Sequence, residues 1–211
     1  MPTPASRPHN SQASSAGTAT PGTDCTALPS SITFAAASAQ TSLAVSATAD
    51  TLAEGPESLV LTLSPGSGYT LGPSGTATIT LEDNRYDAWR FATFSPPQNA
   101  DSLISGPTSD PDQDGLSNHI ESITGGNPFS AGDAPPLTIV QQGSQLILTL
   151  RRSRSAAEAP IAIQSSPDLI TWPAETGAIL TKTTETPDGM TREEFWTLPA
   201  SESRRYFRLN L

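Results

Sequence analysis

The stretch Leu59-Val60-Leu61-Thr62-Leu63 places a leucine at every second residue. Successive side chains of a strand point to opposite faces, so this spacing predicts a β-strand with one buried face. Similar alternation occurs at residues 32–34, 43–47 and 77–81, and segments rich in Gly, Pro and Ser separate these runs. Short strands joined by turns at this spacing predict an antiparallel sandwich.

A second set of alternating segments fills the C-terminal part of the chain, at residues 137–140, 145–150, 161–164, 178–182, 194–198 and 206–211. The first two flank a Gln-Gly-Ser turn and predict a hairpin. The chain is long enough for two domains, and its 20 prolines and 15 glycines suit strands and turns better than helical bundles. We therefore predict an all-β chain with a second antiparallel β-sandwich over residues 137–211.

The acidic charge is concentrated in the first two-thirds of the chain. The formal net charge is −10, whereas residues 137–211 carry eight acidic and eight basic residues. An excess of carboxylates favours cations as partners and argues against nucleic acid, whose phosphates would be repelled.

Residues 110–121 read Asp-Pro-Asp-Gln-Asp-Gly-Leu-Ser-Asn-His-Ile-Glu and fit the calcium-loop pattern at every specified place. Aspartates two residues apart can converge on one cation, Gly115 supplies a sharp turn, and a terminal Glu has the reach for bidentate ligation. The predicted ligands are Asp110, Asp112, Asp114, the carbonyl of Leu116, Asn118 and Glu121. The alternative is a solvated acidic turn that holds no ion.

The segment after the loop predicts a short helix. Leu116, Ile120 and Ile123 share one helix face, and Gly125-Gly126 followed by Pro128 would end the helix. Residues 99–109 show no convincing entering helix. A loop with only an exiting helix resembles the one-sided EF-hand-like loops of dockerins and thrombospondin type 3 repeats, and extracellular modules of this kind bind calcium weakly.

The first strand region also carries a family resemblance. The relevant segments are Gly22-Thr-Asp24, Leu28-Pro-Ser-Ser-Ile-Thr-Phe34, Asp50-Thr-Leu-Ala-Glu54-Gly-Pro-Glu57 and the closing Ala77-Thr-Ile-Thr-Leu-Glu82-Asp83-Asn84. Together they resemble the second half of a Calx-beta motif, a seven-stranded immunoglobulin-like sandwich. In its calcium-binding members, acidic residues at one end of the sandwich hold the ions. The resemblance implies that Asp24, Asp50, Glu54, Glu82 and Asp83 lie at that end.

Three features depart from the Calx-beta pattern. Cys25 stands where the family usually has Tyr, Asn84 stands where a third acid is common, and the first strands of the motif have no counterpart in residues 1–17. The acids can therefore either bind calcium or merely keep the end of the sandwich solvated. Both alternatives stay open at the level of sequence.

A third resemblance spans residues 89–208. It comprises Trp-x-x-x-x-Phe at residues 89–94, the calcium loop, Gly-Gly-Asn-Pro, Ser-x-Asp-Leu-x-x-Trp and a closing Tyr-Phe-Arg-Leu. This order resembles the C-terminal end of secreted proteins of planctomycete and verrucomicrobial type. It implies an extracellular or cell-surface location as part of a longer secreted protein, although the N-terminus lacks the features of a signal peptide.

Catalysis is not expected, because neither His9 nor His119 has a plausible nucleophile partner and the acids occur in metal-loop spacing. The sequence has no run of about 18 apolar residues, so no membrane-spanning helix is predicted.

Two function hypotheses follow. The first is a non-catalytic, calcium-binding structural or adhesive region, with neighbouring extracellular domains or surface polysaccharide as partners. The second is an accessory carbohydrate-binding module of an upstream hydrolase, for which Trp172 and Trp196 are the candidate platform residues.

The predicted organisation has four parts. Residues 1–20 form a disordered tail, because they have almost no apolar content. Residues 21–86 form the N-terminally incomplete Calx-beta-like sandwich. Residues 87–136 form a linker that contains the calcium loop and the short helix. Residues 137–211 form the C-terminal β domain.

Overall fold

The computed structural model describes residues 9–66, 69–132, 137–156, 159–200 and 205–210. The chain divides into two compact units, Met1–Ala92 and Thr93–Leu211. The regular secondary structure of the described chain is mostly β-strand, and all the hydrogen-bonded pairs of named strands are antiparallel. This confirms the predicted all-β class. Among the described residues, no helix is long and apolar enough to cross a membrane.

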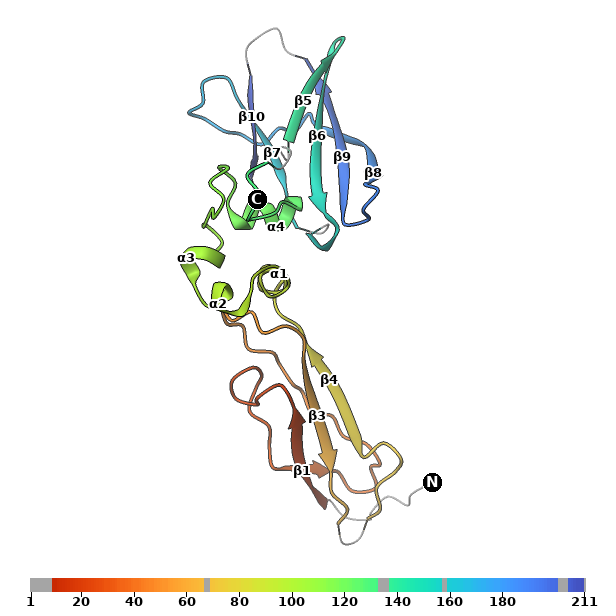
Figure 1. Cartoon of the computed structure of the whole chain (residues 1–211). Coiled ribbons are helices and arrows are strands. Elements are labelled where there is room, and N and C mark those ends of the chain that lie inside the picture. Colours follow the sequence, from red (N-terminus) through yellow and green to blue (C-terminus); the bar gives the residue numbers. More distant parts are fainter. Residues whose placement is uncertain (1–8, 67–68, 133–136, 157–158, 201–204, 211) are drawn as a thin grey trace. The chain divides into compact units, whose positions relative to one another are not determined.

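The first unit contains β1 (His9–Gly17), β2 (Ser31–Phe34), β3 (Glu57–Leu63) and β4 (Thr76–Leu81), in the sheet order β2-β1-β3-β4. The strand β1 changes partner along its length, because His9–Gln12 pair with β2 whereas Ala13–Gly17 pair with β3. Figure 1 shows β3 and β4 running side by side in this unit. The helix α1 (Arg85–Thr93) follows β4.

Two local predictions for this unit are wrong. Residues 9–17, expected to be disordered, form β1. A β-ladder is built from backbone N–H and C=O groups, and small polar residues supply these groups as well as apolar residues do. Residues 1–8 of the predicted tail lie outside the described residues. Residues 43–47, expected to form a strand, instead make an isolated bridge between Ala47 and Cys25 and accept one backbone hydrogen bond, from Thr26 N to Ser46 O.

The core of the first unit is small. Ala19, Cys25 and Leu59 are buried, and they are surrounded by the partly buried Leu28, Val45, Ile79 and Leu81. The single cysteine is therefore a core residue, 1% exposed.

The second unit begins with three short helices, α2 (Pro96–Asn99), α3 (Ser102–Ser105) and α4 (Asn118–Thr124). Its strands are β5 (Leu137–Gln142), β6 (Gln145–Ser153), β7 (Ala162–Ser166), β8 (Ile179–Glu185), β9 (Thr191–Pro199) and β10 (Tyr206–Asn210), with the one-turn helix η1 (Arg154–Ala156) after β6. They form a four-stranded sheet, β5-β6-β9-β8, and a two-stranded sheet, β10-β7. The predicted β5–β6 hairpin is confirmed, with Gly143 at its turn at a φ of 61°. Leu211, placed in the last predicted strand, lies outside the described residues.

Side chains from both sheets form the core of the second unit. Leu148 of β6 and Leu198 of β9 are buried together with Ile163 of β7, and Phe207 and Leu209 of β10 pack against them. Two antiparallel sheets thus share one apolar interior, as expected for a sandwich.

The helix α4 is part of the second unit rather than of a separate linker. Ile123 packs with Ala156, Ala159 and Ile161, and Arg151 Nε of β6 donates a hydrogen bond to the Thr124 carbonyl oxygen at 3.1 Å. The helix ends at Gly125, where φ is 74° and an added Cβ would lie 2.4 Å from Thr191 Cγ2 of β9. Both the left-handed backbone and this close approach require glycine. The compact units therefore do not follow the predicted boundaries at residues 86 and 136.

Candidate metal centre

Three aspartates of the predicted loop lie together. One carboxylate oxygen from each of Asp110, Asp112 and Asp114 lies within 4.8 Å of the other two. Like charges this close repel one another unless a cation neutralises them. The described residues thus bring together the three ligands that the alternating spacing predicted.

Backbone hydrogen bonds hold each aspartate by one oxygen. Gly115 N donates to Asp110 Oδ2 at 3.0 Å, Asp114 N to Asp112 Oδ1 at 3.3 Å, and Leu116 N to Asp114 Oδ1 at 2.7 Å. The turn needs Gly115, whose φ is 90°. The remaining oxygens Asp110 Oδ1 and Asp112 Oδ2 are buried and accept no hydrogen bond from the part of the chain that the structure describes. Asp110 and Asp112 are therefore each oriented by one oxygen and have the other available for a ligand.

Asn118 is fully buried, and its amide is fixed by two hydrogen bonds. Nδ2 donates to the carbonyl oxygens of Ile104 at 2.7 Å and Gly106 at 2.9 Å. These contacts assign the nitrogen, so the other amide atom is an oxygen. Asn118 Oδ1 is also buried and has no hydrogen-bond partner among the described residues. Asn118 therefore combines a structural contact, which the sequence did not predict, with a free acceptor at the ninth loop position.

The segment before the loop is more ordered than its sequence predicted. The one-turn helix α3 is capped by Asp101, whose side chain accepts a hydrogen bond from Leu103 N at 2.9 Å. The loop end is joined to this segment by Asn118 N, which donates to Ser109 O at 2.8 Å, and by His119 N, which donates to Pro107 O at 3.0 Å. The loop is thus held between α3 and α4.

Glu121 lies in the first turn of α4 and is fully buried. An added Cβ at Gly126 would lie 2.9 Å from Glu121 Oε1, so the glycine makes room for this side chain. The group of three carboxylates within 4.8 Å does not include Glu121. The structure therefore places Glu121 in the interior beside the end of the loop, outside the aspartate cluster.

The donor set fits a hard cation. The candidate donors are carboxylate, amide and carbonyl oxygens, which suit Ca²⁺ or Mg²⁺, whereas zinc sites use cysteine and histidine. His119, the one imidazole within the loop, is exposed. Buried oxygens without hydrogen-bond partners cost free energy that a coordinated cation would recover.

A second acidic cluster occurs in the first unit. One oxygen from each of Asp24, Glu54 and Glu57 lies within 4.8 Å of the others. The cluster borders a cavity of about 300 Å³, whose lining also contains Asp50, Glu82, Asp83 and Asp87. Sequence analysis did not name Glu57 as a candidate ligand; in the structure it is the first residue of β3.

Two acids of this cluster, Glu54 and Glu57, have raised pKa values. Burial raises the pKa of Glu54 above its ordinary value, and the charges of Asp24, Asp50 and Asp83 raise it further. The pKa of Glu57 is raised by burial first, then by the charges of Asp24 and Glu54. The neighbouring carboxylates thus destabilise the charged forms of Glu54 and Glu57.

Two other predicted acids of the first unit, Asp50 and Asp83, hold backbone turns. Asp83 Oδ2 accepts hydrogen bonds from Glu54 N at 3.2 Å and Gly55 N at 2.9 Å, and Asp50 Oδ1 accepts one from Leu52 N at 2.8 Å. Asp50, Glu82 and Asp83 line the same cavity but are not in the group within 4.8 Å. The structure therefore brings together Asp24 and Glu54 of the five predicted acids.

Asp87, a further lining residue, already has a cationic partner. Its side chain is buried and accepts a hydrogen bond from Arg90 Nη1 at 2.7 Å, and the same nitrogen donates to Thr51 O at 2.9 Å. Arg90 thus joins α1 to the loop at residue 51, and Asp87, which is neutralised by Arg90, is a poor candidate for a metal ligand.

The two candidate platform tryptophans lie against other side chains. Trp196 packs on the core of the second unit. Trp172 lies 4.4 Å from the guanidinium of Arg208, and its Nε1 donates to Leu169 O at 3.2 Å. The Ser-x-Asp-Leu-x-x-Trp motif forms a tight turn. In this turn, Asp168 Oδ1 accepts hydrogen bonds from Ile170 N at 2.9 Å and Thr171 N at 3.0 Å.

Comparison with known proteins gives no family for this chain: no family model matches it, and a search of curated proteins finds no match.

Proposed function

We propose that this chain is a non-catalytic, calcium-binding structural or adhesive region of an extracellular or cell-surface protein. The ion would be held by Asp110, Asp112, Asp114, the Leu116 carbonyl, Asn118 and Glu121. The observation that carries this proposal is the set of buried oxygens without hydrogen-bond partners in the described chain, Asp110 Oδ1, Asp112 Oδ2 and Asn118 Oδ1.

These oxygens support the presence of an ion, because a buried oxygen that has neither a hydrogen bond nor a cation costs free energy. A buried acceptor without a hydrogen bond costs about 1–3 kcal/mol, and charged groups cost more. Three such oxygens in one loop, beside aspartates within 4.8 Å of one another, are consistent with a position for a cation rather than with a solvated turn. Calcium is favoured over magnesium, because it accepts more oxygen ligands at variable angles and releases its water more readily.

The packing of α4 supports a structural role for the ion. The loop ends in α4, and Ile123 of this helix is buried in the second unit, 5% exposed. An ion that fixes the start of α4 would stabilise the unit into which the helix packs. Such a role suits extracellular calcium levels, with a dissociation constant of about 10⁻⁴ to 10⁻³ M.

The resemblance to Calx-beta sandwiches supports a second proposed cation site in the first unit, at Asp24, Glu54 and Glu57. Its support is the raised pKa of Glu54 and Glu57, since a cation would relieve the repulsion among these carboxylates. Mutation of the loop would leave this second site intact.

The test is isothermal titration of the full chain with calcium. Asp112→Asn removes the charge of a predicted ligand, and Ser117→Ala changes the residue that precedes α4, whose side chain makes no capping hydrogen bond. We expect Asp112→Asn to lose one binding event and Ser117→Ala to keep it. Identical isotherms for Asp112→Asn and the parent protein would contradict the proposal.

A further inference from the structure

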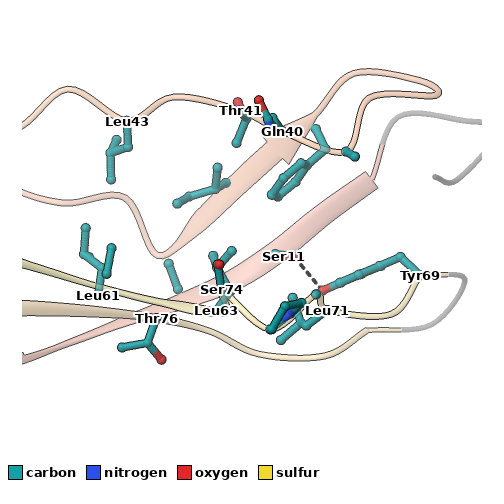
Figure 2. Close-up of a pocket in the computed structure, with 18 of the residues that line it drawn as sticks. Ser11, Gln40, Thr41, Leu43, Leu61, Leu63, Tyr69, Leu71, Ser74 and Thr76 are labelled. Atoms are coloured by element: carbon teal, nitrogen blue, oxygen red, sulfur yellow. Dashed lines mark hydrogen bonds between the residues drawn. The ribbon is translucent and has the colours of Figure 1, made fainter. Parts of the chain in front are cut away.

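A second, larger cavity of about 550 Å³ lies in the first unit, separate from the acidic cluster. It is lined by Ile32 and Phe34 of β2, Leu61 and Leu63 of β3, and Ile79 of β4. Figure 2 shows Leu43, on the opposite side of the space, pointing toward Leu61. The cavity thus lies among the apolar side chains that would form the inner layer of a sandwich.

This apolar layer is only partly covered. Leu43, Leu61, Leu63 and Ile79 are all of intermediate exposure. Protein interiors are normally packed as densely as organic crystals, and a void of this size falls within the range of ligand pockets. The cavity therefore has room for a group that is not part of the described chain.

The lining determines the chemistry of that group. No charged residue occurs among the described residues that line the cavity, although the chain has a formal net charge of −10. The polar groups present are hydroxyls and one amide; Ser11 Oγ, for example, donates to Tyr69 OH at 2.7 Å. An ionic ligand would find no counter-charge in this cavity, so its occupant should be uncharged and largely apolar.

The backbone beside the cavity indicates an extended peptide. Residues 41–45 make no backbone hydrogen bond to any residue that the structure describes. Thr41 and Leu43 of this segment line the cavity. The Leu43-x-Val45-x-Ala47 alternation is that of a strand, yet residues 41–45 pair with no strand of the described chain. One added strand would supply the missing ladder and place alternate side chains in the cavity.

We infer that the first unit binds an extended, uncharged segment of another polypeptide, which adds as a strand along residues 41–45 and fills the 550 Å³ cavity with its apolar side chains. Main-chain hydrogen bonds would give affinity, and the cavity would select apolar side chains at alternate positions. This site is independent of the proposed calcium loop.

The probe is a capped synthetic peptide of alternating Val and Thr, added to the full chain while amide hydrogen exchange is measured. We expect slower exchange at residues 41–45. Leu43→Asp puts a charge into the uncharged cavity and should weaken peptide binding at least tenfold. Ala44→Asp is the matched control, because Ala44 is exposed and does not line the cavity, and it should bind the peptide as the parent does. Asp112→Asn, in the calcium loop, should also bind normally.

Three results would overturn the inference. The first is peptide binding with no protection of residues 41–45, or with equal affinity for Leu43→Asp and Ala44→Asp. The second is protection of the same amides that rises with protein concentration without peptide, which would assign the site to a second copy of the chain. The third is saturation of the cavity by 1-dodecanol while the peptide fails to bind, which would make it a pocket for small apolar molecules.

Discussion

Arg151 Nε donates a hydrogen bond to the carbonyl oxygen of Thr124 at 3.1 Å, and this contact joins β6 to the last residue of α4. It satisfies a carbonyl at the helix end that has no partner within the helix, and it places a cation where the helix dipole favours one. The proposed calcium loop is therefore connected to the sandwich by a polar contact as well as by the burial of Ile123.

Calcium should stabilise the second unit through this connection. With a dissociation constant of about 10⁻⁴ to 10⁻³ M, calcium at about 10 mM should add about 1.4 to 2.7 kcal/mol to the free energy of unfolding. Glu121→Gln should remove most of this gain, because it keeps the shape of the ligand but removes its charge. Thermal unfolding of both proteins in calcium and in EGTA measures the effect. An equal calcium-dependent rise in Tm for both would refute the role of Glu121.

The burial of Ile123 gives a prediction that does not depend on calcium. Ile123 is 5% exposed, so Ile123→Ala should lower the free energy of unfolding of the second unit by about 2–5 kcal/mol. Leu103→Ala is the control, since Leu103 is 85% exposed and its truncation should change stability by less than about 0.5 kcal/mol. Urea unfolding in EGTA distinguishes the two. Similar midpoints would show that α4 is not packed on the sandwich.

Asp168 should make the stability of the second unit sensitive to strong acid. Hydrogen bonds from Ile170 N and Thr171 N, with Ser166, lower the pKa of Asp168 from 3.8 to about 2. A carboxyl whose pKa is lower in the folded state stabilises that state above its unfolded pKa, and this contribution is lost as the pH falls from about 4 toward 2. The parent protein should therefore be more stable than Asp168→Asn at pH 6, and the difference should shrink below pH 4. A difference that is independent of pH would be incompatible with this account.

The acidic cluster of the first unit should respond to pH in the opposite direction. The pKa values of Glu54 and Glu57 are raised, so protonation favours the folded state, and this stabilising effect is lost as the pH rises through the raised pKa values. In EGTA, Glu57→Gln should therefore stabilise the first unit at pH 7 and have a smaller effect near pH 4. Denaturant unfolding at the two pH values provides the measurement. Destabilisation at pH 7 in EGTA would show that the charge of Glu57 has a favourable partner.

The strands were predictable where side-chain burial determines them. β6 alternates between core and surface, and Leu148 and Leu150 are fully buried, so the period of two is visible in the sequence. β1 was not predictable in this way, because it pairs through its backbone and its side chains are mostly small and polar. Residues 43–47 show the converse, since among the described residues this strand pattern meets a partner only at its end, where Ala47 bridges Cys25.

The proposed calcium loop was predictable to the extent that the spacing of its acidic residues is local. Asp110, Asp112 and Asp114 cluster as their spacing predicts. The contacts of Asn118 with Ile104 and Gly106 were not predictable, because they depend on how the preceding segment folds back. Glu57 was missed for a related reason, since its proximity to Asp24 arises from tertiary structure.

The change of partner along β1 has a mechanical consequence. Hydrogen bonds between antiparallel strands lie perpendicular to the strands, so a pull along β1 strains its two ladders in shear, the one with β2 and the one with β3. Force would have to break both sets of bonds together, whereas a strand peeled from a sheet edge loses them one at a time. Under tension, β1 would then resist extraction even though its side chains contribute little to the core.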